Sequence, residues 1–112
     1  MADHRGGILQ RGLLDRIVLG TANIGLRYGR NRSRGVMPLD KAFALLDAAW
    51  AMGIRSFDTA LEYGESSSRL SEWLNRRGVR EEAHVITKVR PDGRGDLRVR
   101  LRQAVDEFQS RR

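Results

Sequence analysis

The sequence predicts an α/β fold built on a parallel sheet, and three observations support this prediction. The chain repeats one pattern three times: a short apolar run, a polar break and an amphipathic helix. The pattern recurs about every thirty to forty residues, which is typical of βαβ units with right-handed crossovers. Apolar residues make up 40% of the 112 residues and charged residues 31%, a composition typical of one small globular domain.

The first unit follows residues 1–14, which we interpret as an N-terminal extension with room for a hairpin turning near Gln10–Gly12. The first strand is expected within residues 15–22 (DRIVLGTA), around an apolar centre of Ile17, Val18 and Leu19. A helix is expected within residues 38–53 (PLDKAFALLDAAWAMG), because proline suits a helix start and glycine follows a helix end. Its apolar stripe would consist of Ala42, Leu45, Leu46, Ala49 and Trp50.

The second and third units follow the same order. A strand is expected within residues 54–60 (IRSFDTA) and a helix over about residues 67–77, with an inner face of Leu70, Trp73 and Leu74 and a stop at Gly78. The third strand is expected within residues 83–89 (AHVITKV). The last helix is expected from about 96 to 109, with a stripe of Leu97, Leu101, Ala104, Val105 and Phe108.

The candidate catalytic and ligand-binding residues lie at the ends of the three predicted strands. Ligands bind at the carboxyl ends of parallel strands, because loops and helix N-termini converge there. The second strand ends in Asp58, with Tyr63 shortly after it, and the third ends in Thr87 and Lys88. The first ends in small residues that let a ligand approach the backbone, namely Gly20, Thr21 and Ala22.

Asp58, Tyr63 and Lys88 together would form a proton-donating device. A free phenol has a pKa near 10 and is a weak acid at neutral pH. An ammonium about 4 Å away contributes about 4 kcal/mol at an effective dielectric of about 20, which lowers a phenol pKa by up to about three units. The carboxylate would hold the ammonium in place. A tuned tyrosine suits protonation of a carbonyl oxygen as hydride arrives at carbon.

Each of these residues also has a purely structural interpretation. Asp58 could cap a turn, Tyr63 could anchor a loop, and Lys88 could be a solvated surface cation. The composition favours a role for Lys88, because 19 of the 21 basic residues are Arg and only Lys41 and Lys88 are Lys.

Three segments resemble the aldo-keto reductases: LGTANIG at residues 19–25, GIRSFDTALEYGESS at 53–67 and VITKV at 85–89. The resemblance implies a (β/α)8 barrel, of which residues 15–112 would supply the first three βα units. It also implies reduction of a small aldehyde or ketone with NADP or NAD as cofactor. Tyr63 would be the general acid, Lys88 would lower its pKa, and Asp58 would pair with Lys88. The nicotinamide would lie against Gly20, Thr21, Ala22 and Asp58.

The chain departs from this family in two respects. Where the family usually has Ser-Glu and then Gly, this sequence has Ser66-Ser67 and then Ser71. A catalytic His at the end of the fourth strand, and the loops that hold the cofactor phosphates, have no counterpart in these 112 residues. A closed barrel needs about 200 residues or more. We therefore expect a truncated or partial protein that is inactive as an isolated chain.

The remaining features restrict the partners. The net charge of +7 raises the question of nucleic acid, but no nucleic-acid-binding motif accompanies it, so we expect no such partner. There is no cysteine, His4 and His84 are isolated, and no metal site is predicted. Neither a membrane span nor a secretory apolar segment is present, which predicts a cytoplasmic protein. The alternative function is a non-catalytic binding or assembly module derived from this family, self-associating through open sheet edges.

Overall fold

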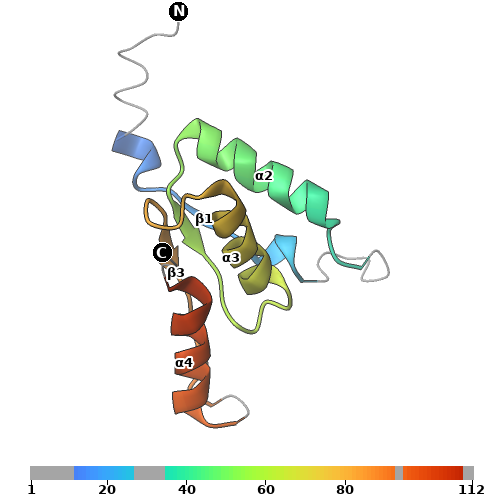
Figure 1. Ribbon diagram of the computed structural model, residues 1–112, viewed down its shortest axis with the longest axis vertical. Helices are drawn as coiled ribbons and strands as arrows, with labels where there is room; N and C mark the ends of the chain where they lie inside the picture. Colours follow the sequence, from blue (N-terminus) through green and yellow to red (C-terminus); the bar gives the residue numbers. More distant parts are fainter. Residues whose placement is uncertain (1–11, 27–34, 93–94, 110–112) are drawn as a thin grey trace, which may run out of the picture.

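The computed structural model describes residues 12–26, 35–92 and 95–109. In these ranges three strands form one parallel sheet in the order β1 (Val18–Gly20), β2 (Ser56–Asp58) and β3 (His84–Ile86). A short 3-10 helix, η1 (Ala22–Ile24), follows β1, and α2 (Leu39–Met52), α3 (Ser66–Arg77) and α4 (Leu97–Phe108) follow the three strands. The predicted alternation of strand and helix is confirmed. Figure 1 shows α3 between α2 and α4.

The register of the sheet separates two faces, because successive side chains on a strand point in opposite directions. The covered face consists of Leu19, Phe57 and Val85, which are register partners and pack into the core. The open face consists of the residues on either side of them, namely Val18, Gly20, Ser56, Asp58, His84 and Ile86. Val18 and Ile86 are 42% and 50% exposed there.

Three aromatic rings form the centre of the core on the covered face. Phe57 lies 6.3 Å from the ring of Trp50 on α2 and 5.7 Å from the ring of Trp73 on α3, measured between centroids. The two indoles are 5.8 Å apart in an edge-on arrangement. Such pairs contribute about 0.5–1.5 kcal/mol beyond the area that they bury. The predicted inner face of α3 is confirmed, since Leu70, Trp73 and Leu74 are all buried.

The predicted stripe of α2 needs one correction. Ala42, Leu46 and Ala49 are buried as expected, but Leu45 is 40% exposed and Phe43 is buried instead. Consecutive residues lie about 100° apart around a helix. Leu45 therefore points well away from a buried face centred on Leu46, whereas Phe43 lies closer to that centre.

The predicted stripe of α4 is only partly covered. Ala104 is buried and Phe108 packs against the core, but Leu97, Leu101 and Val105 are 37%, 48% and 60% exposed. The stripe follows the helical period as predicted; no other part of the described chain covers most of it. The apolar spacing indicates which side of a helix is able to pack, and packing needs a neighbour as well.

Polar contacts fasten the helices to one another. Asp47 of α2 accepts hydrogen bonds from Trp73 Nε1 at 2.8 Å and from Arg77 Nε at 2.7 Å, both on α3. The bond from Arg77 lowers the pKa of Asp47; burial opposes this effect, and the bond from Trp73 adds to it. These contacts explain why α2 and α3 stay in register over the aromatic core.

Ser71, which stands where the family usually has glycine, links α3 to α4. Its hydroxyl donates to the carbonyl of Glu107 at 2.6 Å and accepts from Arg80 Nη2 at 2.8 Å. The larger side chain is therefore accommodated by forming a bridge between two helices.

The hairpin expected near Gln10–Gly12 lies largely outside the described residues, and residues 12–14 form a helical turn. Among the described residues, no helix has both the length and the apolar character needed to cross a membrane.

Candidate active site

The carboxyl ends of the strands lie at one level because the sheet is parallel and in register. Gly20, Asp58 and Ile86 are register partners. Beyond them the backbone continues the pairing, since Thr21 N donates to the Asp58 carbonyl at 2.9 Å and Thr59 N to the Ile86 carbonyl at 2.8 Å. The residues that follow each strand are therefore brought to the same edge of the sheet.

Lys88 joins the second and third strand ends through its ammonium group. Its Nζ donates to Asp58 Oδ1 and, at 3.0 Å, to the backbone carbonyl of Thr59. The same nitrogen lies 5.3 Å from the centroid of the Tyr63 ring, within cation–π range. The structure thus brings together all three residues predicted to form the proton-donating device. The sequence did not indicate the Thr59 carbonyl, because a backbone acceptor leaves no residue-type signal.

The surroundings of Lys88 keep it charged. Burial lowers the pKa of Lys88, but the hydrogen bond and negative charge of Asp58 outweigh this, and Tyr63 adds a smaller contribution in the same direction. The net effect raises the pKa above its usual value of 10.5. The side chains of Lys88 and Asp58 are 47% and 38% exposed, so solvent screens the pair. At neutral pH Lys88 therefore acts as a fixed positive charge.

Tyr63 stands on a tight turn between β2 and α3. Its amide donates to the Ala60 carbonyl at 3.1 Å, and its own carbonyl accepts from Ser66 N at 2.9 Å. Gly64 follows with φ of +57°, a left-handed conformation that favours glycine. A Cβ on Gly64 would also lie 2.5 Å from the Gly25 carbonyl oxygen. The glycine turn therefore fixes where the phenol is presented.

A shallow hollow of about 230 Å³ opens beside the phenol, lined by Gly20, Thr21, Ala22, Asn23, Asp58 and Tyr63. It is smaller than the pockets of about 300–1,000 Å³ that hold whole small-molecule ligands. A side chain at Gly20 would meet no atom within 4 Å, so a flat group has access to the backbone there. The hollow therefore has room for a flat, ring-sized group against the backbone of Gly20.

Two residues beyond the first strand, Asn23 and Tyr28, could line a pocket by their place in the sequence, although a plain loop is the simpler interpretation. Asn23 lines the hollow. Tyr28 lies outside the described residues. Asn23 carried no signal of its own, because its place in the hollow depends on the short turn of η1 that follows Thr21.

Most of this sequence is similar to segments of known proteins. The model of the aldo/keto reductase family matches residues 16–111. The aldo-keto reductase str7 of Strobilurus tenacellus is 37% identical over 83 residues, which make up 70% of this chain and 25% of that protein. Norsolorinic acid reductase stcV of Emericella nidulans is 39% identical over 74 residues, or 64% of this chain and 19% of that protein. The chain thus spans a quarter or less of these curated relatives.

Solved structures show the same likeness. Two solved structures from Pseudomonas aeruginosa, each assigned as an aldo-keto reductase, are 28% identical to this chain, with TM-scores of 0.65 and 0.62. Each comparison covers 85% of this chain, and 39% and 37% of the respective solved chain.

Proposed function

The chain belongs to the aldo/keto reductase family, and from this premise we propose that it serves the NAD(P)H-dependent reduction of an aldehyde or ketone with Tyr63 as proton donor. Family membership supports oxidoreductase activity in general, and the fold is that of the first three βα units of the family's barrel. The observation that carries the finer proposal is the ammonium of Lys88, held by Asp58 and Thr59 at 5.3 Å from the centroid of the Tyr63 ring, which itself lines the hollow.

The proposed roles follow from the charges at this edge of the sheet. Tyr63 would donate its phenolic proton to the carbonyl oxygen of a substrate within about 2.6–3.2 Å of its hydroxyl. The positive charge of Lys88 would stabilise the phenolate that remains after the proton has left. Asp58 would keep Lys88 in place. Solvent would return a proton to the phenolate, since the hollow is open.

The cofactor side of the hollow would be formed by the backbone of Gly20, Thr21 and Ala22, together with Asp58. When bound, NADH or NADPH supplies the hydride that adds to the carbonyl carbon. One hydride and one proton convert the carbonyl group to an alcohol. This chain would therefore supply the proton and align the substrate carbonyl with the cofactor ring. We also propose a cytoplasmic site of action, on the basis of the sequence alone.

We further propose that the 112-residue chain does not turn over substrate by itself. The hollow has room for a ring-sized group, and Asp58 and Lys88 are both more than a third exposed to solvent. Acid–base catalysis gains from a closed site that excludes water. Aldehyde-dependent oxidation of NADPH by the pure 112-residue protein would contradict this proposal.

The experiment that tests the reductase proposal transplants this chain into a complete barrel. Residues 16–109 would replace the matching segment of the Pseudomonas aeruginosa protein, and NADPH oxidation would be followed with a panel of aldehydes and ketones. We expect activity in the chimera and a loss of about 10²- to 10⁴-fold on Tyr63→Phe. Asp40→Asn, a change on the exposed surface of α2, should leave activity unchanged. Equal activity of the Tyr63→Phe chimera would show that Tyr63 is not the donor.

A second candidate function is favoured by the exposed apolar surface. Val18 and Ile86 on the open face, and Leu101 and Val105 on α4, are all at least 42% exposed. A non-catalytic assembly module that self-associates through its open sheet edges would bury them. Light scattering on the purified chain distinguishes the two cases. A discrete oligomer that Ile86→Lys converts to monomer supports the module, whereas a monomer contradicts it.

A further inference from the structure

The loop that follows β1 is held by the first turns of α3. Ser66 Oγ donates to the Ala22 carbonyl at 3.1 Å, and Glu65 N donates to the Gly25 carbonyl at 3.0 Å. Carbonyls at the end of a short helix have no partner within that helix and need one outside it. Here α3 supplies such a partner to the Gly25 carbonyl. It adds a further hydrogen bond to the Ala22 carbonyl, which also accepts from the amides of Gly25 and Leu26, and Ala22 is one of the residues that line the hollow.

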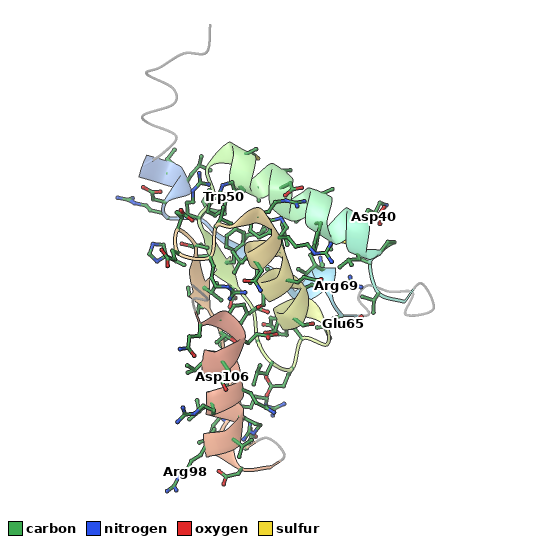
Figure 2. All side chains as sticks on the ribbon, in the orientation of Figure 1. Asp40, Trp50, Glu65, Arg69, Arg98 and Asp106 are labelled. Carbon is green, nitrogen blue, oxygen red and sulfur yellow. The ribbon has the colours of Figure 1, made fainter. Side chains whose placement is uncertain are left out.

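Arg69 provides the strongest of these links. Its Nη1 donates to the carbonyls of Ile24 and Met37, each at 2.6 Å, and its Nη2 lies 3.6 Å from Glu65 Oε2. Figure 2 shows Glu65 and Arg69 at the end of α3 that lies beside η1. The Arg69 side chain is 14% exposed, and charge-assisted bonds of this kind are stronger than neutral ones. One guanidinium thus holds both ends of the connection between η1 and α2.

The same contact sets the position of the tyrosine turn. A Cβ on Gly25 would lie 1.9 Å from Ser66 N, so the loop backbone and the start of α3 touch directly. Ser66 N also donates to the Tyr63 carbonyl at 2.9 Å. The loop wall and the phenol-bearing turn therefore share one attachment on α3, and a displacement of the loop changes its distance from Tyr63.

We propose that Arg69 is a positioning residue, which fixes the Thr21–Asn23 wall of the hollow relative to the Tyr63 turn. Arg69 does not line the hollow and acts through the Ile24 carbonyl. Its catalytic meaning rests on the proposed function. The hydride-bearing ring and the proton donor must reach one carbonyl group together, and productive reaction needs the reacting atoms about 3–3.5 Å apart.

Hydrogen exchange of the 112-residue chain tests the positioning role without any cofactor. In Arg69→Gln we expect the amides of residues 21–26 to exchange about ten- to a hundredfold faster, which corresponds to losing a hydrogen bond from a charged donor. The amides of residues 84–88 should change little. Arg76→Gln, on the exposed side of the same helix, should leave both segments unchanged. Arg69→Lys should be intermediate, because one ammonium does not reproduce the planar fork of arginine.

Unchanged exchange at residues 21–26 would overturn the proposal, as would an equal increase in every segment of Arg69→Gln and Arg69→Lys. Binding of reduced nicotinamide mononucleotide, followed by its fluorescence, then addresses function. We expect about tenfold weaker binding in Arg69→Gln and unaltered binding in Arg76→Gln. If the unmodified chain does not bind this probe, the proposed cofactor side fails while the exchange result still decides the role of Arg69. Equal binding by the unmodified chain and Arg69→Gln would show that the wall it holds does not serve the cofactor.

Discussion

On the covered face of the sheet, Phe57 is fully buried against the indoles of Trp50 and Trp73. On the open face, Ile86 is 50% exposed, although it directly follows Val85, the register partner of Phe57 on the neighbouring strand. The two faces alternate residue by residue along strands of only three residues. The covered face buries the apolar surface that stabilises the chain, and the open face carries Asp58. Stability and candidate chemistry are therefore separated by the pleat of the sheet and not by distance along the sequence.

Removing a ring from the covered face should have the largest effect on the stability of the chain. Phe57→Ala should reduce the free energy of unfolding by about 3–5 kcal/mol, because it leaves a cavity between two helices. That is a large part of the 5–15 kcal/mol typical of a domain, so we expect a much lower urea midpoint. Urea unfolding followed by tryptophan fluorescence measures it. Ile86→Ala on the open face is the matched control and should cost less than about 1.5 kcal/mol. Similar losses at both positions would show that the open face is also buried in solution.

A smaller effect on stability is expected from removing the charge of Asp47, which links α2 to α3 on the covered side. Asp47 has a lowered pKa, so its contribution to stability is present above its unfolded value of about 3.8 and is lost as the pH falls through its lower folded pKa. We expect Asp47→Asn to be less stable at pH 7 and to lose less stability than the unmodified chain between pH 5 and pH 2. Thermal unfolding over this pH range measures the difference. Asp40→Asn on the same helix should retain the full acid dependence.

The smallest effect on stability is expected on the open face. Lys88→Met should change the free energy of unfolding at pH 7 by less than about 1 kcal/mol, which is typical of exposed ion pairs. The raised pKa of Lys88 contributes stability below 10.5 that is lost as the pH rises through the folded pKa, so the two proteins should converge at high pH. Urea midpoints at pH 7, 9 and 11 measure this. Lys41→Met leaves the pair of Lys88 and Asp58 intact and serves as the control for removing a lysine. A Lys88→Met protein that is unfolded at pH 7 would contradict the separation of the faces.

The order of elements and the strand-end residues could be predicted from the sequence, for a local reason. The period of apolar residues identifies each strand and helix, and a parallel sheet places the ends of its strands along one edge. Asp58, Tyr63 and Lys88 could therefore be grouped from the sequence alone, and the expected pairing of Asp58 with Lys88 is present in the structure. The roles assigned to these residues stay predictions.

What could not be predicted depends on neighbours and on the backbone. The stripe of α4 is apolar at the expected spacing, yet Val105 is 60% exposed, because periodicity does not reveal whether a partner covers a face. The clamp of Arg69 on the Ile24 and Met37 carbonyls was also missed. Arginine is the commonest charged residue of this chain, so its type alone gave no signal.

The parallel register has a consequence for how the length of this chain can vary. Gly20, Asp58 and Ile86 lie side by side because the three strands begin and end at matching register positions. Removing Ser56 from β2, with the preceding segment held in place, would shift Phe57 and Asp58 by one position, turning the carboxylate toward the indoles and the phenyl ring toward solvent. Insertions and deletions in related chains should therefore fall in the connections, such as the stretch between η1 and α2, and should spare the strands. A library of single-residue deletions scored for folding would show this pattern as three short intolerant windows.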